Sequence, residues 1–139
     1  MAKTLRGLRG ATTASANTSE AILEATAELL RSLQDMNGFA PDDVESAIFT
    51  SSPDLTADYP ARAARLLGWT AVPLLGAQEV AVPDGLERCI RVLLHLYTAK
   101  PQRELKHMYL REASTLRPDR PAGGPAGPEG SAGRGRADT

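Results

Sequence analysis

The chain has 139 residues, a net charge of −1 and a hydrophobic content of 42%, which fits one domain with a core of its own. The balanced charge argues against a nucleic-acid-binding protein, which needs a strongly basic face, and no apolar run reaches the length of a membrane span. The single cysteine excludes an internal disulfide and is typical of a reducing compartment, so we expect a cytoplasmic protein.

The first half of the chain alternates between strand and helix patterns. Strands are predicted over residues 5–13 and 47–51. Between them, Asn17 and Glu20 have the spacing of a helix N-cap and its capping-box partner. Gly38 is placed to end that helix.

The second half begins with a predicted short helix over residues 60–67 and a strand over 72–75, followed by a loop. A long buried helix is predicted over residues 80–96, because the apolar residues of this stretch recur at helical spacing. Those residues are Leu86, Cys89, Ile90, Leu93 and Tyr97, and on a second face Val92 and Leu96. A last strand is predicted over residues 106–111.

This order of elements predicts an α/β fold, or an α+β fold with a mixed sheet packed by helices. A helix that is apolar on almost every side needs cover from more than one direction. We therefore expect an oligomer in which the subunits complete each other's core.

The C-terminal end has a different composition. The residues from Pro118 onward hold six of the twelve glycines and four of the ten prolines, without apolar periodicity. Such a segment cannot bury enough surface to offset its chain entropy. We expect a folded domain over residues 3–119 and a disordered tail over residues 120–139.

The sequence contains no motif typical of a metal site or of a phosphate-binding loop. The two histidines, His95 and His107, lie apart from any ligand at metal-binding spacing. Neither a glycine-rich phosphate loop nor a Gly-x-Ser-x-Gly nucleophile motif is present. We expect no metal and no cofactor.

Arg91 stands out because it lies in the middle of the apolar stretch. A guanidinium stays charged and is costly to bury unless an anion satisfies it. Either a carboxylate of the protein pairs with Arg91, or an anionic ligand does, and this stretch alone leaves both possibilities open.

Four other polar residues share this kind of setting: Arg9, Arg65, Glu79 and Tyr109. Taken singly, Arg65 is better explained as a solvated surface charge, and Arg9 is explained equally well in that way. Taken together with Arg91, the set offers an excess of positive charge and one carboxylate, with no nucleophile and no general base near neutral pH. Such a set suits a small dianion that bears a hydroxyl, and it would act by positioning and electrostatics.

Four of these residues, Arg9, Glu79, Arg91 and Tyr109, lie in motifs that resemble the monofunctional chorismate mutases of the trimeric α/β-barrel class. The resemblance runs in order from Leu5 to Asp119. Its motifs are Arg6-Gly7-Leu8-Arg9-Gly10-Ala11-Thr12-Thr13, Ser52-Pro53-Asp54-Leu55, Tyr59-Pro60-Ala61-Arg62-Ala63, Gly68-Trp69, Gln78-Glu79, Cys89-Ile90-Arg91-Val92, His107-Met108-Tyr109-Leu110 and Leu116-Arg117-Pro118-Asp119.

This resemblance implies a homotrimer that converts chorismate to prephenate without a cofactor, in phenylalanine and tyrosine biosynthesis. It implies that Arg9 and Tyr109 hold the carboxylate of the enolpyruvyl side chain. Arg91 would reach that carboxylate and the ether oxygen whose bond breaks. Glu79 would accept a hydrogen bond from the ring hydroxyl.

The resemblance also places the active sites in clefts between subunits. Residues from the stretch before Glu79 would line one wall, namely Leu75, Gly76, Ala77 and Gln78. Tyr59 and Arg65 of the neighbouring subunit would close the site, and the chain near Arg117 would cover it. Two alternatives are a trimeric imine deaminase of similar fold and a non-catalytic trimer that binds a metabolite of the shikimate pathway.

Overall fold

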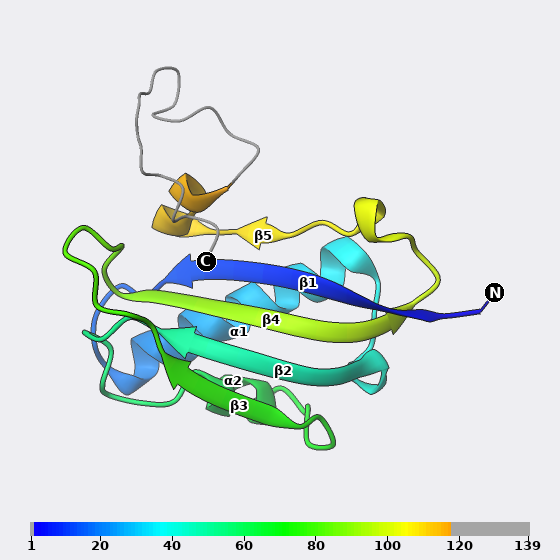
Figure 1. Ribbon diagram of the computed structural model, residues 1–139. Helices are drawn as coiled ribbons and strands as arrows, with labels where there is room; N and C mark the ends of the chain where they lie inside the picture. The colour runs from blue at the N-terminus through cyan, green and yellow to red at the C-terminus, as the bar shows by residue number, and fades with distance from the viewer. Residues whose placement is uncertain (1, 118–139) are drawn as a thin grey trace, which may run out of the picture.

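The computed structural model describes residues 2–117, which form a five-stranded mixed sheet with its helices on one face. The strand order is β3-β2-β4-β1-β5 (Figure 1). The elements are β1 (Thr4–Thr13), α1 (Ser19–Asn37), β2 (Val44–Ser51), α2 (Ala61–Leu66), β3 (Leu74–Gln78), β4 (Cys89–Thr98) and β5 (Met108–Tyr109). Short 3-10 segments are η1 (Pro41–Asp43), η2 (Gln102–Glu104) and η3 (Arg111–Leu116). The tail expected over residues 120–139 lies outside the described residues.

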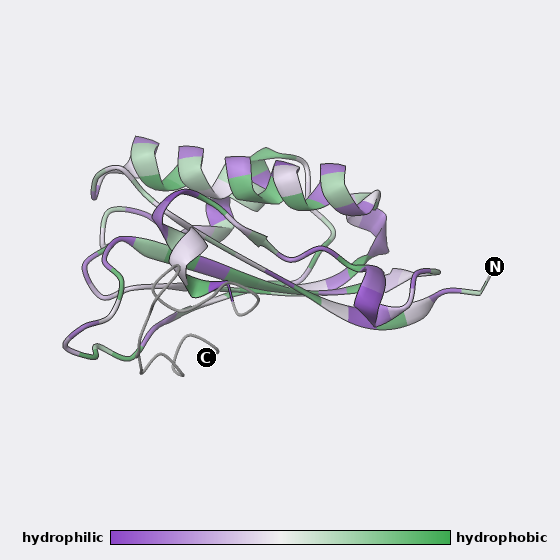
Figure 2. Ribbon diagram, turned by 90° about the horizontal axis from the view of Figure 1, so that it is seen from above, coloured by the Kyte–Doolittle hydropathy of each residue, from purple (hydrophilic) through white to green (hydrophobic). Residues whose placement is uncertain are grey.

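Both helices cover the same face of the sheet, as the edge-on view in Figure 2 shows. The core lies between this face and the helices, where Leu29 and Leu33 of α1 pack with Leu8, Phe49 and other buried side chains of the strands. Gly10 allows the close approach of α1, because a Cβ at this position would lie 3.0 Å from the Cδ1 atoms of both leucines. The opposite face of the sheet carries no helix among residues 2–117.

The helix predicted over residues 80–96 is wrong, because this stretch contains the central strand of the sheet. β4 pairs with β1 on one side and with β2 on the other, antiparallel to both. Ile90, Val92, Leu94 and Leu96 are buried under the helices. The residues between them point to the opposite face, so the side chains alternate as a strand requires. The strand carries apolar residues on both of its faces, since Leu93 lies on the face away from the helices. Apolar residues on every side are also what the sequence of a buried helix shows.

The cap predicted for the first helix is also wrong. Thr18 is the N-cap, and its hydroxyl accepts a hydrogen bond from the Ala21 amide. Asn17 instead accepts hydrogen bonds from the amides of Thr56 and Ala57, which join a distant loop to the start of the helix. The predicted C-terminus is confirmed, since Gly38 adopts the left-handed conformation with φ 68°.

Three of the predicted strands have different bounds. The strand expected over residues 47–51 begins earlier, at Val44. The strand expected over residues 72–75 begins at Leu74 and extends to Gln78, so Gln78 belongs to β3 rather than to a loop. The strand expected over residues 106–111 is reduced to the two residues of β5. Arg111 breaks it with a positive φ of 53° and begins η3.

The mixed α/β architecture expected from the sequence is confirmed. No helix among residues 2–117 has the length and the apolar character needed to cross a bilayer.

Candidate active site

The helix-free face of the sheet carries two adjacent rows of side chains that run across the strands. The first row follows the pairs Ala77–Thr50, Thr50–Arg91, Arg91–Ala11 and Ala11–Tyr109, and so crosses all five strands. Because paired residues of neighbouring strands share a face, Arg91 lies between Thr50 and Ala11 on this face.

The second row lies one pleat further along the strands. It follows the pairs Leu75–Ile48, Ile48–Leu93 and Leu93–Arg9. The two rows bring Arg9, Arg91 and Tyr109 to one region of the sheet although they are far apart in the sequence. The pairing register therefore builds the site.

A cavity of about 240 Å³ lies over these rows. Its polar lining combines two arginines, a carboxylate, a phenol and a hydroxyl: Arg9, Arg91, Glu79, Tyr109 and Thr50. Its apolar lining is formed by Gly10, Ala11, Ile48, Val92 and Leu93. The structure thus brings together Arg9, Glu79, Arg91 and Tyr109, the four residues to which the resemblance gives direct contacts with the reacting substrate.

Glu79 and Arg91 face each other in this cavity. Glu79 follows the last residue of β3, and its amide donates to the Ser51 carbonyl, which prolongs the pairing of β3 with β2. Its Oε2 atom lies 3.4 Å from Arg91 Nε and accepts a 2.5 Å hydrogen bond from the Thr50 hydroxyl. Thr50 thereby orients the carboxylate.

Arg91 remains under-satisfied despite this ion pair. Its Nε atom is buried and makes no hydrogen bond to any of the described residues. The 3.4 Å contact with Glu79 is made by this same atom but lacks hydrogen-bond geometry, and a buried cationic nitrogen that is paired so weakly is costly. Of the two partners that the sequence left open for Arg91, a carboxylate of the protein and an anionic ligand, the structure shows the carboxylate, Glu79. An anionic group in the cavity would supply a further acceptor.

Side chains complete the outer edge of β1 next to Arg9. The Gln102 side chain accepts a 3.0 Å hydrogen bond from the Gly7 amide through Oε1 and donates a 2.6 Å hydrogen bond to the Gly7 carbonyl through Nε2. His107 Nδ1 accepts a 3.0 Å hydrogen bond from the Arg9 amide. Burial, and then the charge of Arg9, lower the pKa of His107, which favours the neutral ring that this acceptor role requires.

Tyr109 reaches the cavity from the short strand β5. The Leu110 amide donates to the Ala11 carbonyl and continues the pairing of this strand with β1. Arg111 then bonds Glu28 Oε1 at 3.0 Å and the Thr13 carbonyl at 3.1 Å. These bonds hold the segment after Tyr109 against α1 and the end of β1.

The other predicted site residues do not reach this cavity, although Leu75 and Ala77 of the edge strand β3 lie at the ends of the two rows. Tyr59, Arg65, Leu75, Gly76, Ala77 and Gln78 line a second cavity of about 690 Å³ between β3 and the segment that leads into α2. None of them lines the cavity that holds Arg91. Within one chain, the predicted set is therefore split into two groups.

The chemistry available in the first cavity is electrostatic. No group of three His, Cys, Asp or Glu side chains within residues 2–117 is arranged to hold a metal ion. Cys89, close to Arg91 in sequence, is buried, and this burial raises the pKa of its thiol to about 11. A thiol in that state is a poor nucleophile at neutral pH.

Sequence reasoning missed Thr50 and the apolar floor made by Ile48 and Leu93. Nothing in the local sequence distinguishes Thr50 from other strand threonines. Its role arises because the register pairs it with Arg91 and places its hydroxyl on Glu79.

A helix-free sheet face with two arginines and one carboxylate around a small cavity is the arrangement of an α/β protein suited to a small anionic ligand. Residues 5–120 match the family model described as chorismate mutase type I. The chain therefore belongs to the type I chorismate mutase family, which confirms the family expected from the sequence and favours it over the imine deaminase alternative.

Individual relatives agree with this assignment. Two proteins named chorismate mutase AroH match over 116 residues, or 83% of this chain. The relative from Thermus thermophilus is 49% identical over 95% of its length, and that from Bacillus subtilis (strain 168) is 43% identical over 91%. The solved structure of a chorismate mutase from Clostridium thermocellum is 45% identical, with a TM-score of 0.77, and the match covers 78% of this chain and 96% of that one.

Proposed function

We propose that the chain catalyses the rearrangement of chorismate to prephenate in the cavity that holds Arg91. The observation that carries this proposal is the under-satisfied guanidinium of Arg91, which faces Glu79 and shares its cavity with Arg9 and Tyr109. Chorismate matches this lining, because it is a dianion with a ring hydroxyl and an enolpyruvyl ether.

The reaction breaks the ether C–O bond and forms a C–C bond across the ring in one intramolecular step. Negative charge grows on the ether oxygen as the bond breaks. Arg91 stabilises this charge, and because β4 fixes its backbone, the guanidinium need not reorient during the reaction. Arg9 and Tyr109 bind the side-chain carboxylate and hold the substrate in its reactive shape.

Glu79 completes the set as an acceptor. In its ionised form it takes a hydrogen bond from the ring hydroxyl, while Thr50 and Arg91 hold its Oε2 atom. None of these groups needs to gain or lose a proton, so the site requires no general base and no cofactor.

We further propose that the working form is a homotrimer in which neighbouring chains complete each site. Tyr59 and Arg65 line the second cavity and not the Arg91 cavity of their own chain, and the family resemblance assigns them to the site of a neighbouring chain. The sequence suggested an oligomer because residues 80–96 were expected to form a helix that is apolar on all sides, and that reason no longer applies.

The helix-free face of the sheet gives a different reason for an oligomer. Its large side chains Leu5, Leu75 and Tyr97 are 45%, 63% and 42% exposed, and exposed apolar surface of this kind is typical of an interface between chains.

Purified protein tests the function directly. We expect the absorbance of chorismate to fall with time and prephenate to appear in equal amount, without added metal or cofactor. Tight binding of chorismate without turnover would contradict the proposal and favour the non-catalytic binding protein. Absence of both binding and turnover would contradict both.

A further inference from the structure

The end of β2 and the residues that follow it lie against both ends of the exposed loop formed by residues 80–88. At one end, the Glu79 amide donates to the Ser51 carbonyl at 2.9 Å. At the other end, the Ser52 amide donates to the Cys89 carbonyl, also at 2.9 Å. Glu79 and Arg91, which face each other in the cavity, thus lie just outside the two ends of this loop.

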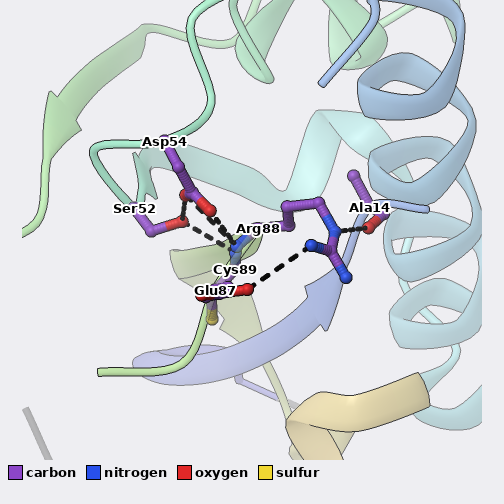
Figure 3. A network of polar contacts seen from close by, with 6 residues as sticks. All are labelled: Ala14, Ser52, Asp54, Glu87, Arg88 and Cys89. Carbon is purple, nitrogen blue, oxygen red and sulfur yellow. Dashed lines mark hydrogen bonds and ion pairs between the residues drawn. The ribbon is translucent and has the colours of Figure 1, made fainter. Parts of the chain in front are cut away.

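Two side chains of this segment, Ser52 and Asp54, form what we call the Ser52–Asp54 anchor (Figure 3). The Arg88 amide donates to both carboxylate oxygens of Asp54, at 3.0 Å and 3.2 Å. The Ser52 hydroxyl donates to Asp54 Oδ1 at 2.5 Å and accepts from the Cys89 amide at 2.9 Å. The anchor therefore binds two successive amides at the point where the regular pairing of β2 with β4 has ended.

The backbone that the anchor holds is unusual. Arg88 has a positive φ of 49°, a conformation that residues other than glycine rarely adopt. From the opposite side, Ala14 at the end of β1 bonds it twice: the Ala14 amide donates to the Arg88 carbonyl at 2.8 Å, and Arg88 Nε donates to the Ala14 carbonyl at 3.0 Å. Contacts from both neighbouring strands thus impose this reversal immediately before β4 begins (Figure 3).

We propose that the Ser52–Asp54 anchor is a positioning device for Arg91: it fixes the first residues of β4 so that the guanidinium stays aimed at the substrate beside Glu79. Arg91 depends on its backbone for this aim, since its contact with Glu79 is 3.4 Å long and its Nε makes no hydrogen bond within the described chain. The inference rests on the proposed function, because it assigns Arg91 to the reacting ether oxygen.

Ser52 and Asp54 are positioning residues rather than catalytic ones. They do not line the cavity that holds Arg9 and Tyr109. They line an adjoining cavity of about 300 Å³, which Glu79 and Arg91 border as well. Their connection with the reaction passes through the backbone of residues 88–91.

Asp43 provides a matched control at the opposite end of the same strand. Its carboxylate likewise accepts one backbone and one side-chain hydrogen bond, from the Ala40 amide at 3.0 Å and from Lys3 Nζ at 2.8 Å. It precedes β2, whereas Asp54 follows it. Loss of Asp43 therefore removes comparable hydrogen bonds without touching the start of β4.

Cys89 offers a readout that does not depend on activity. It is the only cysteine of the chain, it is buried, and its amide is bonded to Ser52. Cys89 is only 5% exposed although it borders the adjoining cavity, so local opening at the start of β4 should control how fast a thiol reagent reaches it. If the anchor holds the start of β4, its loss will accelerate the labelling of Cys89.

The experiment compares wild type, Asp54→Ala and Asp43→Ala at a temperature at which circular dichroism shows all three to be folded. We measure kcat and KM with chorismate and the rate at which 5,5′-dithiobis(2-nitrobenzoate) labels Cys89. For Asp54→Ala we expect kcat to fall roughly tenfold to hundredfold, the scale for a small misplacement of a catalytic group, and labelling to accelerate. Asp43→Ala should keep the wild-type kcat and labelling rate even where its Tm is lower.

Equal kcat values and labelling rates for the two alanine variants would overturn the proposal. A second pair, Ser52→Ala and Ser52→Thr, decides the question if Asp54→Ala does not fold. Threonine keeps the hydroxyl that bridges Asp54 and Cys89, so it should restore kcat and slow labelling, and failure to do so would count against the anchor. If wild type does not turn over chorismate, the proposed function fails, and the labelling rates alone then decide whether the anchor holds the start of β4.

Discussion

At the scale of single residues, Arg91 carries the electrostatic part of the proposed mechanism. We expect Arg91→Ala to lower kcat by about two to three orders of magnitude, the usual cost of removing one donor to a charge that develops in the transition state. Arg91→Lys should recover little, because an ammonium group cannot reproduce the planar contact with two oxygens. Steady-state kinetics measure both effects, with circular dichroism confirming that the variants are folded. More than about a tenth of wild-type turnover in Arg91→Ala would contradict its assignment to the ether oxygen.

His107 predicts a dependence on pH. Because its pKa in the folded chain is lowered, the folded state prefers the neutral ring. The stability that the neutral ring contributes is present above the pKa that His107 has in the unfolded chain, about 6.5. It is lost as the pH falls through the lower pKa that His107 has in the folded chain. Protonation also removes the acceptor for the Arg9 amide, so we expect KM for chorismate to rise in the same acidic range.

The variants His107→Asn and His107→Gln test this prediction. The asparagine amide oxygen lies close to the position of Nδ1 and does not titrate, so His107→Asn should keep KM low and flatten its pH dependence. Glutamine places its amide group further out, near the position of Nε2, and should not restore the bond. Identical pH profiles for wild type and His107→Asn would show that another group is responsible.

At the scale of elements, the contact between α1 and β1 depends on one glycine. Gly10→Ala places a methyl group 3.0 Å from two leucine side chains of α1, and we expect a loss of about 1 kcal/mol or more in the free energy of unfolding. Gly7→Ala is the control on the same strand, because a Cβ there meets no atom within 4 Å, and it should change stability by about 0.5 kcal/mol or less. Urea denaturation measures both, and equal effects would contradict the packing argument.

Much of the element pattern could be predicted from the sequence, because local chemistry decides it. The alternation in residues 5–13 and the glycine after α1 act within a few residues of the structures they produce. β4 could not be recognised in this way. One face of β4 is buried under the helices, and on the other face Leu93 lines the cavity. The strand is therefore apolar toward both faces, and its apolar residues also fit helical spacing.

The site was predictable only in part, for a related reason. Arg9, Glu79, Arg91 and Tyr109 could be selected as unusual charges or phenols in apolar surroundings and from the family motifs. Thr50 could not, because its hydrogen bond to Glu79 follows from the register of β2 with its neighbours. Pairing register is a property of the tertiary structure and leaves no local signal at a single threonine.

At the scale of the whole molecule, the shared site predicts complementation between inactive variants. An Arg91→Ala chain lacks one half of the proposed cleft, and an Arg65→Ala chain lacks the other. In trimers mixed at random from equal amounts, roughly a quarter of the clefts combine both intact halves. Refolding the two variants together should therefore restore measurable turnover. Mixed trimers of the correct mass in light scattering, without recovered activity, would contradict a site shared between chains.

The pairing of the strands has a further consequence for how the cavity opens. β4 is hydrogen-bonded to neighbours on both sides, whereas β5 is a two-residue strand at the edge of the sheet. Edge segments with few backbone bonds exchange their amide hydrogens through local opening, and central strands do so only when the whole domain unfolds. The amide of Arg91 should therefore be among the slowest to exchange with deuterium, and the amide of Tyr109 much faster. Substrate entry and product release are then expected to involve movement on the Tyr109 side, while the guanidinium stays in place on the part of the molecule that opens last.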